Sequence, residues 1–406
     1  MLGLEKIRDP NVFRLYAATL LVGLAYGISL SLTAIHLDAH GFGKEAIGNL
    51  AAWFAGGLVL ISLPIGALIR RLSGKRVLTG ALIGYAGAVA LFPWVSSYGG
   101  LAAVRFVDGA CSVAVWVSCE TLLLSRAEPD HKAFTMSLYT VTLALGYILG
   151  PILARLVVIA APLTAAFGVA AAFALLAASY VALRLEPDSN NPNKGHATSD
   201  TAGGESAWSI LWKIKASCFA TFSYGYFQAT VVLFLPIYLM ESKGILRERT
   251  ILIPAFFAAG MLLFSNPVGR FGDRVGHLSV MRGLAAIGTS MILGFVFLDA
   301  YPLMCAAVFI AGASLATISP ISLALQGAQC EASEYSRATA IYNTFYAAGI
   351  LLGPPIAGRL FARSGGQLML YHLAALWMAF IAFSILFARD DPRARRSLAV
   401  PEKERA

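Results

Sequence analysis

Apolar stretches of about 20 residues recur twelve times along the chain, and this repetition constrains the fold more than any other feature. A helix of that length crosses the hydrocarbon core of a bilayer, which is about 30 Å thick. Hydrophobic residues make up 58% of the 406 residues and charged residues only 13%, a balance that excludes an ordinary soluble domain. The stretches do not alternate in polarity, which excludes a membrane barrel. The sequence therefore predicts an all-α polytopic membrane protein.

Twelve transmembrane helices with short loops account for most of the chain. The first apolar stretch lacks a small-residue cleavage site, so we expect a retained helix and not a secretory signal. The expected spans are residues 14–37, 46–69, 76–96, 100–124, 134–157, 163–184, 210–240, 250–269, 278–299, 302–325, 338–361 and 368–388.

Lysine and arginine are unevenly distributed between the two sets of loops. Most of the 31 lie in the N-terminus, in alternate loops and in the C-terminal tail. Because cytoplasmic loops collect these residues, both termini are predicted to be cytoplasmic, in a multi-pass protein of the bacterial inner (plasma) membrane. The net charge of +9 thus reflects topology, and we expect no nucleic acid partner.

The longest polar interruption, residues 186–208, is rich in Pro, Gly, Asn and Ser and is predicted to be a cytoplasmic linker. It separates two predicted six-helix bundles, residues 1–185 and 209–389, followed by a cytoplasmic tail, 390–406. The five cysteines and six histidines have no metal-ligand spacing, and no phosphate-binding loop or nucleophile motif occurs. We therefore expect neither an enzyme nor a bound metal or cofactor.

An internal repeat relates the two halves at a constant offset of 203 residues. The matching pairs are Pro64 with Pro267, Gly66 with Gly269, Arg71 with Arg274, Gly109 with Gly312, Tyr139 with Tyr342, Gly146 with Gly349, Gly150 with Gly353, Pro151 with Pro354 and Ala154 with Ala357. One offset for three spans of each half predicts a duplicated, pseudo-symmetric six-helix unit. Paired halves of this kind are a transporter architecture with the substrate site near the middle of the membrane. We expect a monomer.

The loops that follow the second and eighth spans read GALIRRLSGKR and GRFGDRVGH. Both are similar to the G-x-x-x-D-R-x-G-x-K/R loop of the major facilitator superfamily, and the resemblance covers nearly the whole chain. It implies a gating latch at Arg71, Asp273 and Arg274, although Arg70 and Ser73 depart from the pattern in the first copy. Asp273 is expected beside the positive end of a neighbouring helix. The alternative is a charged loop that only obeys the distribution of basic residues.

The fifth span contains GYILGPILA and the eleventh contains GILLGPPIA. Two glycines four residues apart leave a groove for another helix, and the proline that follows favours a bend. These residues are predicted gating hinges: Gly146, Gly150, Pro151, Gly349, Gly353 and Pro354. The pattern in the fifth span resembles the antiporter signature of the same superfamily, and its alternative is ordinary close packing.

The fourth span carries three charged residues, Arg105, Asp108 and Glu120. Charges inside a span are costly and face a partner or a water-filled cavity. The spacing of Arg105 and Asp108 allows an ion pair, and Glu120 lies on nearly the same face. Arg105 with Gly109 resembles the superfamily's R-x-x-x-G signature, which implies a link to protons. We predict proton coupling at the three charged residues, with a static ion pair and a membrane-end glutamate as the alternatives.

The three charged residues of the fourth span have apolar counterparts at the offset of 203 residues, namely Val308, Ala311 and Leu323. This asymmetry favours a function over a requirement of the fold.

Polar and aromatic residues on several spans are candidates for substrate contact: Tyr26, Trp116, Tyr224, Gln228 and Asn343. Such a lining suits a small amphipathic compound, cationic compounds included. The leading hypothesis is a secondary active transporter that exports this compound in exchange for protons, an efflux antiporter. The alternatives are a facilitator or importer of an anionic metabolite bound by Arg105, and a receptor or assembly component that does not transport.

Overall fold

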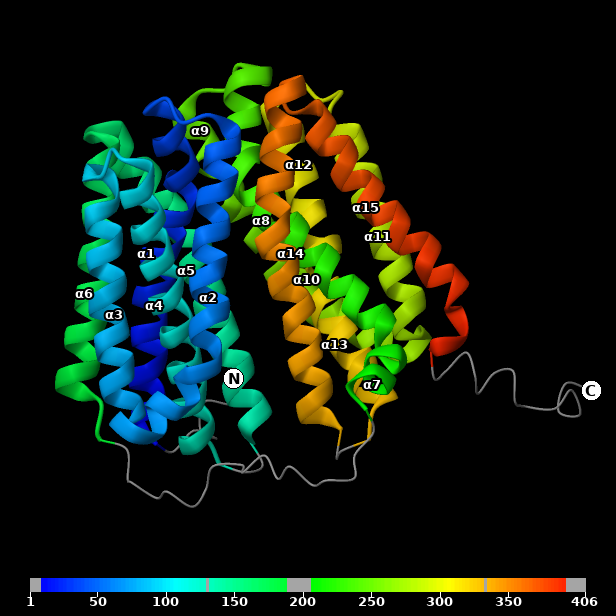
Figure 1. The fold of residues 1–406 in the computed structure, drawn as a ribbon, viewed down its shortest axis with the longest axis horizontal. Helices are drawn as coiled ribbons and strands as arrows, with labels where there is room; N and C mark the ends of the chain where they lie inside the picture. The colour runs from blue at the N-terminus through cyan, green and yellow to red at the C-terminus, as the bar shows by residue number, and fades with distance from the viewer. Residues whose placement is uncertain (1–8, 129–130, 188–205, 332–333, 392–406) are drawn as a thin grey trace, which may run out of the picture. The chain divides into compact units, whose positions relative to one another are not determined.

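The computed structural model describes residues 9–128, 131–187, 206–331 and 334–391, and within them the chain is helical with no strand (Figure 1). Twelve helices are long and apolar enough to cross a membrane, which confirms the all-α polytopic fold. The helices of the first half are α1 (Pro10–Ala39), α2 (Lys44–Leu72), α3 (Gly74–Leu91), η2 (Phe92–Trp94), α4 (Tyr98–Arg126), α5 (Lys132–Ala160) and α6 (Leu163–Arg184). Those of the second half are α7 (Ala207–Lys213), α8 (Lys215–Lys243), α9 (Arg247–Thr250), α10 (Ile253–Val275), α11 (His277–Phe295), α12 (Tyr301–Ala311), η4 (Gly312–Ala316), α13 (Ile318–Gln329), α14 (Tyr335–Ser364), α15 (Gln367–Leu386) and η5 (Ala388–Asp390).

Two of the expected spans differ from the structure in detail. The seventh was expected to begin at residue 210, but the chain leaves the helical conformation at Ile214, so that α7 is separate and the span is Lys215–Lys243. The tenth is one span, Tyr301–Gln329, but a π-helical turn, η4, lies between α12 and α13. An apolar stretch measures length and says nothing about local helix type, which explains why the sequence missed both features.

Glycines set the closest helix crossings of the first half. In this half α1 packs against α5 and α6, and α4 packs against α2 and α3. A Cβ atom at Gly57 would lie 2.8 Å from the backbone nitrogen of Ala110, and one at Gly109 would lie 2.9 Å from the carbonyl carbon of Phe54. Because real Cβ atoms do not approach backbone so closely, α2 and α4 cross at a distance that only glycine permits.

The second half repeats this crossing at the offset of 203 residues. A Cβ atom at Gly260 would lie 2.8 Å from the backbone nitrogen of Ala313, and one at Gly312 would lie 2.9 Å from the carbonyl carbon of Phe257. The repeat seen in the sequence is therefore also a repeat of helix packing.

The helices form two compact units. The first contains α1 to α6 and residues 232–255, which include the second part of α8 and all of α9. The second contains α7, the first part of α8, most of α10 and the helices that follow. The predicted division into residues 1–185 and 209–389 stays a prediction. Most of the predicted linker, residues 188–205, and most of the tail, 392–406, lie outside the described residues.

Candidate functional site

A buried ion pair lies within α4. The guanidinium of Arg105 donates to the carboxylate of Asp108, as their spacing predicts, and the two residues are only 8% and 5% exposed. Ser112, one turn further on, donates from its hydroxyl to Oδ1 of Asp108 at 3.4 Å. The guanidinium carbon of Arg105 lies 4.4 Å from the ring centre of Phe54 on α2, a cation–π contact. The pair is thus stabilised from two sides by residues of the first unit.

An aromatic cluster lies on the same unit and contains two of the predicted substrate residues. The ring centre of Tyr26 is 4.5 Å from that of Tyr85, 5.7 Å from that of Trp116 and 6.3 Å from that of Tyr147. The hydroxyls of Tyr26 and Tyr85 are buried near the side chains of Ser112 and Ser29, and the buried indole nitrogen of Trp116 has no hydrogen-bond partner among the described residues. An unpaired donor is costly in an apolar surrounding, so the indole N–H of Trp116 is available to a ligand.

Glu120 is apart from the ion pair. It lies fifteen residues after Arg105 on α4, about 22 Å along the axis at 1.5 Å per residue. Its side chain is exposed and has no hydrogen bond or ion pair to any residue that the structure describes. The three charged residues of α4 thus form one buried pair and one separate carboxyl.

The tenth span shows which of these features the fold requires. Its buried positions match those of α4 at the offset of 203 residues, and Val308 and Ala311 are 3% and 8% exposed. They occupy the positions of Arg105 and Asp108 with equal burial and no charge. The fold therefore accepts apolar residues where the first unit has an ion pair.

The remaining predicted substrate residues lie on the second unit. The hydroxyl of Tyr346 donates to Oε1 of Gln228 at 3.0 Å, and its ring stacks on that of Tyr224 with the centres 6.0 Å apart. Asn343 is exposed on α14, and no hydrogen bond joins it to these three residues. The second unit thus brings Tyr224 and Gln228 together with Tyr346 and leaves Asn343 out.

The predicted hinge glycines lie at two further close crossings. A Cβ atom at Gly150 on α5 would lie 2.7 Å from the Cα of Gly27 on α1, and one at Gly353 on α14 would lie 2.7 Å from the carbonyl oxygen of Tyr226 on α8. The neighbouring glycines, Gly146 and Gly349, are equally close to α1 and α8. Both helices continue unbroken through the prolines that follow, Pro151 and Pro354. Close packing is present at both motifs, and their role in gating stays a prediction.

The loop residues of the predicted latch are all exposed. Asp273 accepts from Nε2 of His277, the first residue of α11, at 3.1 Å. The carboxylate at the N-terminal end of α11 belongs to Asp391, which accepts from the backbone of Leu278 at 3.0 Å. The expectation for Asp273 stays a prediction, and nothing in the sequence pointed to Asp391, a carboxylate 113 residues from Leu278. The latch role of Arg71 and Arg274 stays a prediction.

No group of three or more His, Cys, Asp or Glu residues suited to a metal occurs in the described parts of the chain. The five cysteines form no disulfide, and four of them are buried. The candidate site is therefore built from an ion pair, a separate carboxyl and aromatic side chains.

Twelve spans, repeated helix crossings and buried charge within one half define a polytopic transport protein. A family model described as the Major Facilitator Superfamily matches residues 15–246 and again 217–406. The chain belongs to the Major Facilitator Superfamily of membrane transporters.

Known proteins of similar sequence and fold agree with this assignment. The chain is 22% identical over 395 residues to an uncharacterized MFS-type transporter, YcaD, of Salmonella dublin, a match covering 94% of this chain and 97% of the relative. The nucleoside transporter NupG has the same fold, with a TM-score of 0.81 and 13% identity over 93% of this chain and 99% of NupG. A bacterial homologue of the human lysosomal transporter Spinster has a TM-score of 0.75 and 13% identity, over 94% of this chain and 98% of its own. At these identities the two structures establish the fold alone.

Proposed function

We propose that this transporter exports a small amphipathic organic compound and takes up protons in exchange, with Arg105 and Asp108 as the coupling pair. The observation that carries the proposal is the burial of this pair in a half whose counterpart needs no charge there. A charge at the centre of a span costs at least about 2.5 to 3.5 kcal/mol, so a charged pair that the fold does not require is retained for its chemistry.

The chemistry follows from the contacts of Asp108. A proton on this carboxyl removes the countercharge of Arg105, and among the described residues the ring of Phe54 remains as an attraction for the guanidinium. A buried cation without its partner is unfavourable by several kcal/mol, so the protonated state favours a rearrangement of the helices around the pair. Exchange requires that this rearranged state binds the substrate weakly, so that proton binding and substrate binding oppose each other without a shared atom.

The aromatic cluster around Tyr26 supplies the proposed substrate contacts in the first unit. Its aromatic rings and the unpaired indole N–H of Trp116 suit a ring-bearing compound that accepts hydrogen bonds. The stacked pair of Tyr224 and Tyr346, with the Gln228 amide, provides a similar combination in the second unit. We place Glu120 as the carboxyl through which protons reach α4 from the adjoining aqueous side.

A second candidate is the transport of an anionic compound by a facilitator or importer. It is favoured by one observation, the buried Nε atom of Arg105, which has no hydrogen-bond partner among the described residues. A guanidinium with an unpaired N–H can donate to a second carboxylate. NupG transports nucleosides by name, and nucleosides therefore belong in any panel of test compounds.

The remaining parts of the proposal follow from the sequence. Both termini are placed in the cytoplasm of a bacterium, with the protein in the inner membrane as a monomer that turns over by rocking of residues 1–185 against 209–389. Reporter fusions at the two termini test this topology: activity of a cytoplasmic fluorescent reporter at both ends supports it, and activity of a periplasmic phosphatase at either end contradicts it.

The coupling is tested with purified protein in liposomes and a panel of cationic, neutral, nucleoside and anionic compounds. We expect uptake driven by an imposed pH gradient and abolished by Asp108→Asn, while Glu120→Gln slows uptake and leaves binding intact. Transport that ignores the gradient in the wild type contradicts proton coupling. A preference for anions that Arg105→Lys removes, with no pH dependence, establishes the second candidate instead.

A further inference from the structure

The short helix α7 carries exposed tryptophans and lies far in sequence from the ion pair of α4. Ile210 and Ile214 are 1% and 0% exposed and belong to a cluster with Cys218, Cys330 and Ala338. Trp208 and Trp212, one turn apart on another side of the helix, are 70% and 55% exposed, and their rings stack with centres 6.5 Å apart. The side chains of Ile210 and Ile214 therefore hold α7 against the rest of the second unit, while the indoles of Trp208 and Trp212 remain exposed.

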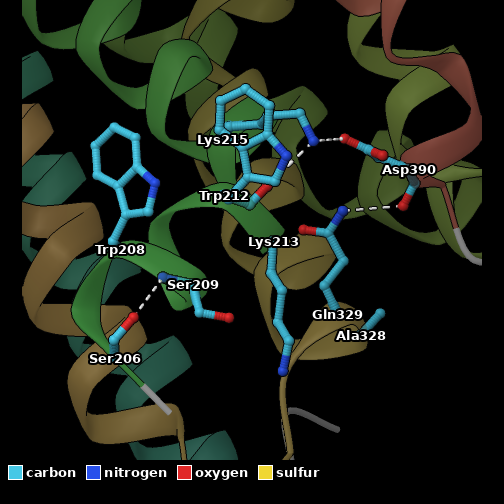
Figure 2. Close-up of a pocket in the computed structure, with 9 residues that line it drawn as sticks. All are labelled: Ser206, Trp208, Ser209, Trp212, Lys213, Lys215, Ala328, Gln329 and Asp390. Atoms are coloured by element: carbon cyan, nitrogen blue, oxygen red, sulfur yellow. Dashed lines mark hydrogen bonds and ion pairs between the residues drawn. The ribbon is translucent and has the colours of Figure 1, made fainter.

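The indoles border a pocket of about 880 Å³ on the second unit (Figure 2). It is lined by Ser206, Trp208, Ser209, Trp212, Lys213, Lys215, Ala328, Gln329 and Asp390. Figure 2 shows Lys215 between the indole of Trp212 and the carboxylate of Asp390. The amide of Gln329 donates to the backbone carbonyl of Asp390 at 2.9 Å and fixes that end of the wall.

Two lysines line this pocket, and they differ in how far their ammonium groups are covered. Lys215 pairs with Asp390 and lies 5.0 Å from the ring centre of Trp212 and 4.5 Å from that of Phe387. Lys213 pairs at 2.8 Å with Glu334, which does not line the pocket, and 35% of the lysine side chain remains exposed. Each lysine thus has a carboxylate partner, and the exposed part of Lys213 is where a phosphate oxygen could share the ammonium group with Glu334.

The position of α7 relative to the membrane indicates that such a phosphate belongs to a lipid headgroup. One residue, Ile214, separates α7 from the transmembrane helix α8. The 29 residues of α8 extend for about 43 Å, which matches a hydrocarbon core of about 30 Å plus the headgroup layers on both sides. The start of α8, and α7 with it, therefore falls at the level of the lipid headgroups. Tryptophan concentrates at that level because its ring is apolar and its N–H is polar.

We propose that α7 is an interfacial anchor that inserts Trp208 and Trp212 among the lipids and binds an anionic phospholipid headgroup in the adjoining pocket. The indoles contact the glycerol and upper acyl region, and Lys213 contacts the phosphate. This proposal is independent of the transported compound and of proton coupling.

The depth of Trp208 is measured by fluorescence quenching of the full-length protein in phosphatidylcholine vesicles. Spin labels are placed either on the headgroup or deep in the acyl chain, and the emission of Trp208 is the difference between wild type and Trp208→Phe. We expect this difference to be quenched more strongly by the headgroup label. Trp377→Phe is the matched control, because Trp377 is fully buried and its emission should respond to neither label. If aqueous iodide alone quenches Trp208, the side chain lies in water and the proposed membrane anchor is wrong. If no agent quenches it, other parts of the chain cover it and the proposal is likewise wrong.

The headgroup site is tested by thermal stability in detergent with added phosphatidylglycerol, phosphatidylcholine or sn-glycerol 3-phosphate. We expect phosphatidylglycerol alone to raise the midpoint of unfolding, and Lys213→Gln to reduce that rise by more than half. Lys75→Gln removes a lysine from the first unit and should leave the rise unchanged. An equal rise with sn-glycerol 3-phosphate identifies a soluble phosphate ligand and overturns the lipid site. No rise with any of the three also overturns it.

Discussion

Ser73 and Gly276 occupy the same place in the two halves, 203 residues apart, and both have a positive φ, 81° and 116°. Each residue directly precedes a helix, α3 or α11. Among the described residues, Ser73 is the only one other than glycine with a positive φ. A side chain in this conformation costs of order 1 to 3 kcal/mol. The first half therefore holds local strain where the second half has none.

Replacing Ser73 by glycine should stabilise the protein by about 1 kcal/mol, because the strain is relieved while the loss of a serine cap to glycine costs only a few tenths. A rise in the midpoint of thermal unfolding in detergent measures the effect. Ser97→Gly is the matched control, since Ser97 precedes α4 with an ordinary φ of −83° and should not stabilise. A lower midpoint for Ser73→Gly than for wild type would refute the strain.

Removing one member of the buried ion pair should destabilise the protein strongly. In Asp108→Ala the guanidinium of Arg105 stays buried without its countercharge, at a cost of about 3 to 5 kcal/mol. The double variant Arg105→Met with Asp108→Ala should recover most of this loss, because Val308 and Ala311 occupy the matching positions in the second half. Thermal midpoints of wild type, Asp108→Ala, Arg105→Met and the double variant measure the coupling energy.

The same double variant separates stability from function. It should fold with near wild-type stability and lose any dependence of transport on the pH gradient. If the losses of stability in the two single variants add up to the loss in the double variant, Arg105 and Asp108 do not stabilise each other, and Asp108 acts alone.

The close crossing of α1 and α5 predicts opposite effects of two similar substitutions. Gly150→Ala should destabilise the protein and slow transport, because the new Cβ atom would lie 2.7 Å from the Cα of Gly27. Gly168→Ala on α6 places a Cβ atom in open space and should stabilise by about 1 kcal/mol through helix propensity. Unfolding midpoints compare the two, and equal midpoints would show that α1 can shift away from α5.

The carboxyl of Glu186 gives a prediction for acid stability. Hydrogen bonds from Asn11 at 3.2 Å and Arg14 at 3.1 Å lower the pKa of Glu186 below its ordinary value. The unfolded chain then binds the proton more readily than the folded chain. The contribution of Glu186 to the free energy of unfolding is therefore complete above about pH 4.3, and it is lost as the pH falls through the pKa of the folded state. The midpoint of wild type minus that of Glu186→Gln should therefore rise with pH and then level off. Because Glu186 is exposed, salt should shrink the difference, and a difference without pH dependence would contradict this assignment.

Local spacing was sufficient for part of the site. The pairing of Arg105 with Asp108 follows from three residues on one helix, and the glycine crossings follow from small residues four apart. The number of spans and the repeat follow from apolar length and a constant offset. These features depend on one helix, or on one helix compared with its copy.

Contacts between helices distant in sequence were not predictable in the same way. Phe54 reaches Arg105 from α2, and Tyr85 and Tyr147 reach Tyr26 from α3 and α5. The hydrophobic periodicity of α2, α3 and α5 does not single out these residues, because any aromatic residue on the inner face of a neighbouring helix could make the same contact. Asp391 as the carboxylate at α11 belongs to the same class of contact.

The matching burial of α4 and the tenth span has an evolutionary consequence. A duplicated gene gives both copies the same shape, and natural selection afterwards acts on each copy separately. Here both descendants kept their pattern of inward positions, while Arg105 and Asp108 in one stand opposite Val308 and Ala311 in the other. The shape of the repeated unit is therefore separable from its charge: the two halves share the first and differ in the second.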